Sequence, residues 1–101
     1  MSEPTTERQI APPRTWLILG ERTGDNAQVL ALGRALGWPG TIKQIRYDDS
    51  CTVDFKDRGA SLTGIDLPRS DPLTAPWPDA IIAIGRRSVP VARWIRAQAA
   101  R

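Results

Sequence analysis

Hydrophobic residues along this chain gather in short runs that stop at a glycine and lead into a polar loop. The first run covers residues 15–19 and is followed by Gly20, and another covers residues 79–85 and has Gly85 at its end. Continuous apolar runs of this length are typical of parallel strands that are buried on both faces of a sheet. We therefore predict two buried strands, each leading directly into a loop.

A helical pattern follows the first loop. Asp25 lies three residues before Gln28, which is the spacing of a capping box, so we expect Asp25 to cap this helix. Gly37 is placed to end the helix, and Gly33 lies inside it, where close packing on the sheet would explain the missing side chain. The apolar positions at helical spacing are Val29, Leu30, Leu32 and Leu36.

A second helical pattern follows Gly85. We expect Ser88 to be its N-cap, with Pro90 in the first turn, where the missing N–H is harmless. Arg93 and Arg96 lie off the apolar face. That face consists of Val91, Ala92, Ile95 and Ala99.

The remaining segments are less regular. Residues 41–47 alternate between apolar and polar types, which predicts another strand, nearer an edge of the sheet. Residues 48–78 are polar and rich in proline, and we expect either a short helix or a lid or interface segment there. Residues 1–14 are expected to form a flexible tail. Residues 15–101 then form the domain.

Strands and helices in this order predict an α/β fold. Right-handed crossovers would make the sheet mostly parallel, with helices on both faces, as in part of a three-layer Rossmann-like domain. The loops after the two apolar strands would then open on the same edge of the sheet. Ligands of open α/β sheets bind at that edge, and helix N-termini there attract anions.

The composition excludes several kinds of site. The hydrophobic fraction is 41% and the charged fraction 25%, which is ordinary for a globular domain. Cys51 is the single cysteine and there is no histidine, which rules out a disulfide framework, His-based triads and most zinc sites. We expect no metal, no catalytic role for Cys51 and no bound cofactor. The four tryptophans are expected in the core or at its rim.

The first 14 residues lack the apolar stretch of a signal peptide, and no segment has the ~20 apolar residues of a membrane span. We therefore expect a cytoplasmic protein or one that is peripheral to a membrane. The net charge is +3, and no acidic residue follows Asp79. This basic end suits phosphate groups or an acidic surface, although a solvated helix face explains it equally well. Nucleic acid is not an expected partner, because the arginines are not interleaved with aromatic residues.

The first loop carries a dense set of polar residues. Arg22 suits a phosphate, and Glu21 or Asp25 suits a hydroxyl group or the role of a base. Capping alone would also account for Asp25. The loop lacks the glycine pattern of nucleotide-binding loops. The other candidate ligand-binding residues of this loop are Gly20, Thr23, Gly24, Asn26 and Gln28.

The second loop places two guanidinium groups at the start of a helix. Cations there oppose the helix dipole, so Gly85, Arg86, Arg87 and Ser88 form a candidate site for an anion or a phosphate. Salt bridges or solvated arginines are the alternative explanation.

Three motifs together resemble the mitochondrial-fission "elongated mitochondria" family. They are Gly-Glu-Arg-Thr-Gly-Asp-Asn-Ala-Gln from Gly20, Ile-Lys-Gln-Ile-Arg-Tyr from Ile42, and the run from Ala75 to Arg96 that contains Trp-Pro-Asp and Gly-Arg-Arg-Ser. The resemblance covers about residues 16–96. Bacterial members of this family are described as glycosyltransferases related to an O-antigen-conversion protein.

The resemblance implies the start of the N-terminal half of a GT-B glycosyltransferase. Two Rossmann-like halves face each other in that architecture, and the N-terminal half faces the acceptor. The implied reaction transfers a sugar from a nucleotide-sugar to an acceptor hydroxyl. Because the chain stops at Arg101, we expect the second domain to be missing and the short chain alone to be inactive.

Two alternatives remain open at this point. The chain is a non-catalytic interaction module that docks through its basic C-terminal helix on a protein or membrane surface, or it has no independent function. Arg93 and Arg96 would carry the docking in the first alternative.

Overall fold

The computed structural model describes residues 12–48 and 59–101, and its fold is α/β. Within these residues, three strands form one sheet in the order β2-β1-β3. Both pairings are parallel, which confirms the expected parallel sheet and the Rossmann-like fold class. The strands are β1 (Thr15–Leu19), β2 (Gly40–Gln44) and β3 (Ala80–Ile82).

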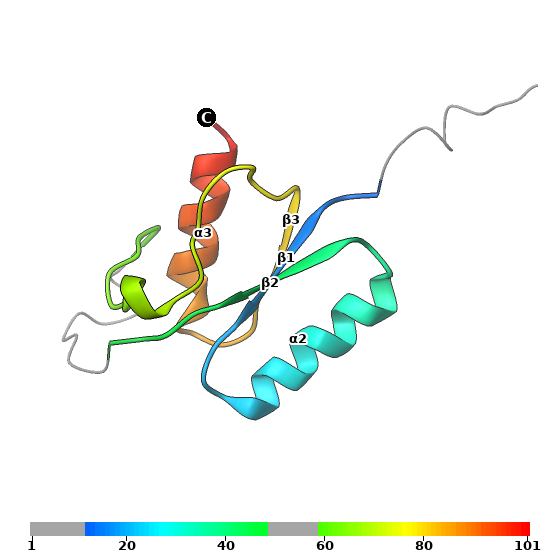
Figure 1. Cartoon of the computed structure of the whole chain (residues 1–101), viewed down its shortest axis with the longest axis horizontal. Coiled ribbons are helices and arrows are strands. Elements are labelled where there is room, and N and C mark those ends of the chain that lie inside the picture. The colour runs from blue at the N-terminus through cyan, green and yellow to red at the C-terminus, as the bar shows by residue number, and fades with distance from the viewer. Residues whose placement is uncertain (1–11, 49–58) are drawn as a thin grey trace, which may run out of the picture.

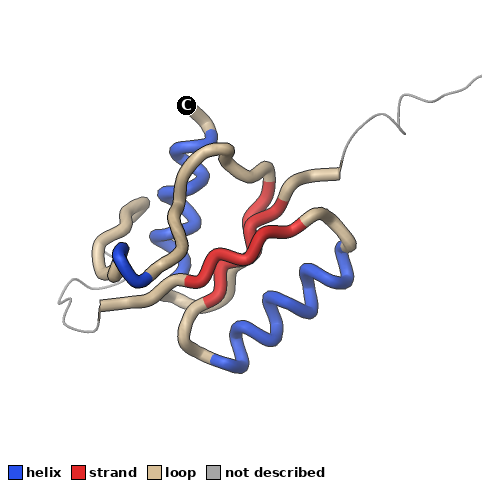
Figure 2. Tube along the Cα trace, viewed as in Figure 1, coloured by secondary structure: helices blue, strands red, loops and turns tan. Residues whose placement is uncertain are grey.

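The two long helices, α2 (Thr23–Leu36) and α3 (Ser88–Ala99), lie on opposite sides of the sheet (Figure 1). The tube in Figure 2 shows the same three layers, with the strands between the helices. A 3-10 helix, η2 (Leu67–Arg69), confirms the short helix that was one expectation for residues 48–78. Residues 49–58 of that segment and residues 1–11 of the expected tail lie outside the described part of the chain.

The central strand β1 is buried along its whole length. Its side chains alternate between the two helical layers, as the pleat requires. Trp16 and Ile18 pack with Val91 and Ile95 of α3. Trp77 extends this cluster, because its ring centroid lies 5.8 Å from that of Trp16.

The other face of β1 packs against α2. Leu17 and Leu19 form a second cluster with Val29. A Cβ on Gly33 would lie 3.1 Å from one methyl carbon of Leu17, which confirms the close helix–sheet packing expected at this glycine. Gly37 ends α2 in the left-handed conformation, with φ of 67°, as expected.

The chain after β2 is held by a later segment. The backbone N–H of Gln44 donates to Asp71 Oδ2 at 2.7 Å, and that of Asp71 donates to the Gln44 carbonyl at 2.9 Å. Further along, Tyr47 and Ile65 form an isolated antiparallel bridge. This pairing explains why β2 ends earlier than the expected residue 47: the chain leaves β1 and joins the later segment.

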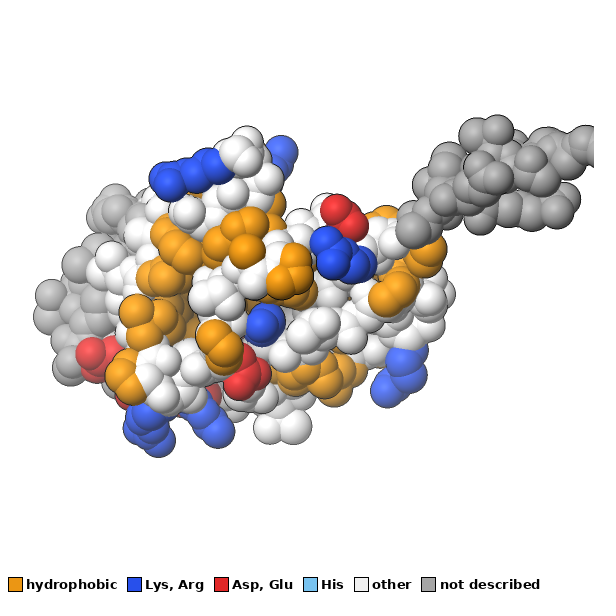
Figure 3. Space-filling model, turned by 45° about the horizontal axis from the view of Figure 1, so that its top comes forward, with side chains coloured by type: hydrophobic (Ala, Val, Ile, Leu, Met, Phe, Trp, Pro, Cys, Tyr) orange, Lys and Arg blue, Asp and Glu red, His pale blue; other side chains and the backbone are white. Residues whose placement is uncertain are grey.

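Part of the expected apolar face is exposed. Trp38 is 38% accessible, so it lies outside the core, whereas Trp16 is buried at 6%. Leu32, Leu36 and Ile42 are also exposed. The face in Figure 3 shows hydrophobic side chains at the surface between polar ones. Among the described residues, none of the helices has the length and apolarity needed to cross a membrane.

The contact between Gly33 and Leu17 leads to a stability prediction. A Gly33→Leu variant forces a large side chain against β1, and overpacking of this kind costs about 1–3 kcal/mol. We expect its melting temperature, followed by circular dichroism, to fall by at least ~5 °C. Ala35→Leu is the control, because Ala35 is exposed on the same helix. Equal melting temperatures for the two variants would contradict the close packing.

Candidate functional site

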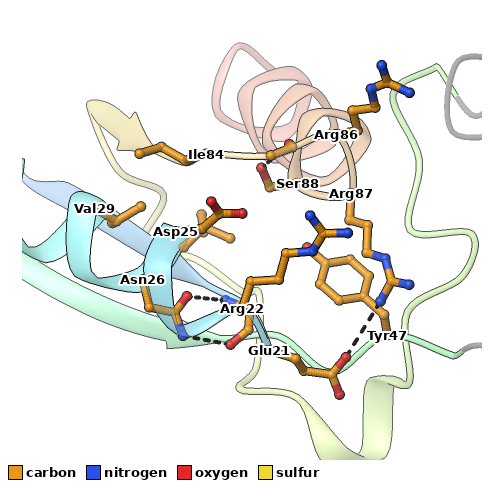
Figure 4. A pocket seen from close by; sticks show the side chains of 13 residues that line it. Glu21, Arg22, Asp25, Asn26, Val29, Tyr47, Ile84, Arg86, Arg87 and Ser88 are labelled. Atoms are coloured by element: carbon orange, nitrogen blue, oxygen red, sulfur yellow. Dashed lines mark hydrogen bonds and ion pairs between the residues drawn. The ribbon is translucent and has the colours of Figure 1, made fainter.

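The loops after β1 and β3 meet at one edge of the sheet. Since both strands run in the same direction, their carboxyl ends lie side by side, as expected. A pocket of about 530 Å³ opens between the two loops. Figure 4 shows polar side chains from both loops around it.

Most of the candidate residues line this pocket. Thr23, Gly24 and Gln28 do not, and all three are exposed on α2. The candidates that line it are Gly20, Glu21, Arg22, Asp25, Asn26, Gly85, Arg86, Arg87 and Ser88.

Asn26 fixes the shape of the first loop. Its Oδ1 accepts a hydrogen bond from the Gly20 N–H at 2.9 Å, and its Nδ2 donates to the Gly20 carbonyl at 2.9 Å. Gln44 Nε2 donates to the same carbonyl, also at 2.9 Å. The Gly20 peptide is therefore held by two side chains, and the Asn26 amide acts on the loop through these bonds.

Asp25 is not the helix cap that its spacing predicted. Helix α2 begins earlier, Arg22 is the N-cap, and no side chain caps the helix. Asn26 binds Gly20, the residue that follows β1, and α2 begins before Asp25. Asp25 therefore falls in the first turn of the helix and lines the pocket. A Cβ placed on Gly85, where φ is 99°, would lie 3.0 Å from Asp25 Oδ2. The carboxylate thus reaches across to the second loop.

Ser88 also differs from its expected role. Arg87 is the N-cap of α3, in helical conformation, and Ser88 is the first residue of the helix. The buried Ser88 hydroxyl donates to the Gly85 carbonyl at 2.8 Å. This hydrogen bond closes the turn from Gly85 to Ser88. The hydroxyl therefore points toward the preceding loop and does not cap the helix.

An ion pair joins the two loops. Arg87 Nη1 lies 3.6 Å from Glu21 Oε1, and both side chains are about two-fifths exposed, at 38% and 39%. The guanidinium carbon of Arg87 also lies 5.5 Å from the centre of the Tyr47 ring. Glu21 and Arg87 are therefore paired with each other at the pocket.

The other charged side chains of the pocket have fewer partners. Within residues 12–48 and 59–101, Arg22, Asp25 and Arg86 have neither a side-chain hydrogen bond nor an ion pair. Figure 4 shows the Arg22 guanidinium between Asp25 and Tyr47, whereas Arg86 projects away from this group. Neither α2 nor α3 has a side-chain cap at its N-terminus. The Arg22 guanidinium and two helix N-termini without side-chain caps thus lie at the pocket, where they favour an anion.

The sequence interpretation did not single out Tyr47, Ile18, Val29 and Ile84 as site residues, although they line the pocket. The three aliphatic residues belong to the buried runs and form its apolar wall. Tyr47 could have been predicted as a pocket residue from the sequence. It ends the alternating run 41–47, and the ends of parallel strands lie at the same edge of the sheet. Among the described residues, no group of three His, Cys, Asp or Glu side chains is arranged to hold a metal ion.

The double hydrogen bond of Asn26 gives a prediction about loop stability. Asn26→Ala leaves the Gly20 N–H without its partner, and an unpaired polar group of this kind costs about 1–3 kcal/mol. We expect urea denaturation to show that loss in the free energy of unfolding. Gln28→Ala, on the exposed face of the same helix, is expected to change it by less than about 0.5 kcal/mol. Equal stability of both variants would contradict the structural role of Asn26.

Comparisons with known proteins identify the family of the chain. No curated protein and no solved structure matches the chain. The sequence model of the family described as "Mitochondrial fission ELM1" matches residues 23–101, which include all of α2, the second loop and all of α3. Because this match covers more than half of the chain, the chain belongs to the mitochondrial fission ELM1 family.

Proposed function

We propose that the chain is the N-terminal, acceptor-binding portion of a glycosyltransferase with a GT-B-like architecture. The parallel sheet and the pocket at its carboxyl edge support this proposal. In the architecture implied by the family resemblance, a second Rossmann-like half presents the nucleotide-sugar donor. The chain then supplies the groups that hold and activate the acceptor.

The observation that carries the proposal is the Asp25 carboxylate. It lies in the pocket, and within the described residues it has no hydrogen-bond or ion-pair partner. Glu21, the other candidate base, is paired with Arg87. Asp25 is therefore the carboxylate that is available to accept a hydrogen bond from an acceptor hydroxyl.

The proposed reaction is a direct displacement. The acceptor oxygen forms a bond to the anomeric carbon of the donor sugar while the bond from that carbon to the nucleoside diphosphate breaks. Asp25 takes the hydroxyl proton, and the nucleoside diphosphate leaves with the bonding electrons. Arg22 orients the acceptor, and Asn26 keeps the loop in the shape that presents Asp25.

An activity assay tests the role of Asp25. In the protein at its full natural length, Asp25→Asn keeps the size of the side chain but removes the base. We expect kcat for sugar transfer from nucleotide-sugars to fall about 10²–10⁴-fold. KM for the acceptor should change little.

Asp66→Asn is the matched control, because Asp66 pairs with Arg69 outside the pocket. We expect this variant to keep full activity. Unchanged kcat in Asp25→Asn removes Asp25 from the mechanism, and the absence of transfer from a panel of nucleotide-sugars removes the proposed function.

A second candidate function is docking on an anionic surface of protein or lipid. It is favoured by the solvent face of α3, where Arg93 and Arg96 are exposed and Val89 is 43% accessible. No acidic residue lies in residues 80–101 to oppose these charges. In this case the pocket is incidental to binding.

Charge reversal tests the docking function. An Arg93→Glu/Arg96→Glu variant should bind vesicles that contain anionic lipid at least about tenfold more weakly, because each basic residue near such a surface contributes ~1 kcal/mol. Binding of the unmodified chain should weaken as salt is added. Arg34→Glu, on α2, is the control. Equal binding by the double variant would exclude docking through α3.

A further inference from the structure

We infer that the acceptor carries a phosphate monoester next to its reacting hydroxyl, and that the Glu21 carboxylate lies where this phosphate binds. This inference rests on the proposed function, because it names the class of acceptor for the same pocket. The phosphate lies between Arg22 and Arg87, and the hydroxyl lies at Asp25.

The ion pair between Glu21 and Arg87 shows where an anion binds. A carboxylate already lies near the Arg87 guanidinium, at 3.6 Å. That separation exceeds the ~2.7–2.9 Å of a charge-assisted hydrogen bond, and a half-exposed pair of this kind contributes little. A ligand with more charge and better geometry can therefore displace Glu21.

Two guanidinium groups favour a phosphate monoester over a carboxylate. A sugar carboxylate that replaces Glu21 carries the same single negative charge as the Glu21 side chain, so it has no advantage in charge. A phosphate monoester carries a charge of about −1.5 to −2 and presents three strong acceptor oxygens. It can therefore contact Arg22 and Arg87 together, and Arg22 has no side-chain partner in the described part of the chain.

The surroundings of Arg87 keep the site in place when Glu21 moves. The Tyr47 ring lies beside the guanidinium, with 5.5 Å between the guanidinium carbon and the ring centre, and a cation over a ring is attracted to it. At the other end of the pocket, the Asp25 carboxylate lies close to Gly85. Its negative charge repels a phosphate and accepts a hydroxyl, so the ligand is oriented.

Binding measurements on the whole chain test this inference. Isothermal titration at constant ionic strength would compare glucose 6-phosphate, glucuronate, inorganic phosphate and glucose. We expect glucose 6-phosphate to bind most tightly. Glucuronate binding as tightly as glucose 6-phosphate overturns the preference for a phosphate monoester. If inorganic phosphate binds as tightly as glucose 6-phosphate, the pocket does not recognise the sugar of the acceptor, and the inference is overturned.

The role of Glu21 is tested by whether a substitution tightens or weakens the binding of glucose 6-phosphate. Glu21→Gln removes the carboxylate charge that competes with the phosphate at Arg87, and it should tighten glucose 6-phosphate binding about two- to fivefold. Asp66→Asn removes the same charge from an ion pair outside the pocket and should leave binding unchanged. If the Glu21–Arg87 pair only held the two loops together, Glu21→Gln would weaken binding. Equal or weaker binding overturns the inference.

Arg22→Ala should weaken glucose 6-phosphate binding about tenfold or more, whereas Arg34→Ala should not. These binding results do not depend on sugar transfer. If the binding pattern holds and no transfer is found, the proposed function fails while the phosphate site remains. If transfer depends on Asp25 but glucose 6-phosphate is not preferred, the inference about the acceptor fails.

Discussion

The burial of β1 on both faces is the constraint on which the rest of the structure depends. Five consecutive side chains of this strand are buried, so the fold needs one helical layer for each face and a neighbouring strand on each side. The parallel pairing with β2 and β3 follows from that requirement. It also brings the ends of β1 and β3 to the same edge, where the two loops form the pocket. The site is thus a result of how the chain covers its most buried strand.

Much of the fold could be predicted from the sequence, because the signals were strong and local. The apolar runs that end at Gly20 and Gly85 indicated buried strands, and Gly33 and Gly37 marked a close contact and a helix end. The same reasoning placed both loops at one edge of the sheet. Most of the pocket residues followed from this placement, because they lie directly after the two strands.

The roles of single residues were harder to predict, because they depend on contacts between distant segments. The capping pattern at Asp25 was outweighed by the bonds of Asn26 to Gly20, which start α2 earlier. The end of β2 is set by pairing with a segment more than 20 residues later, which no local pattern indicates. The alternating run indicated where Tyr47 lies, but not the long-range pairing that holds it at the pocket. Its partner in the antiparallel bridge, Ile65, carries no signal of that contact in the sequence.

The hydrogen bond between the starts of β1 and β3 has a consequence for synthesis on the ribosome. The backbone N–H of Arg14 donates to Asp79 Oδ2, across a separation of 65 residues. During translation, β1, α2 and β2 emerge long before β3, so they can pair and cover only the Leu17 face of β1. The cluster around Trp16 and Ile18 is completed only when Trp77 and α3 leave the ribosome. Until then the nascent chain exposes part of an apolar sheet face, and it is then that the protein most needs protection from aggregation.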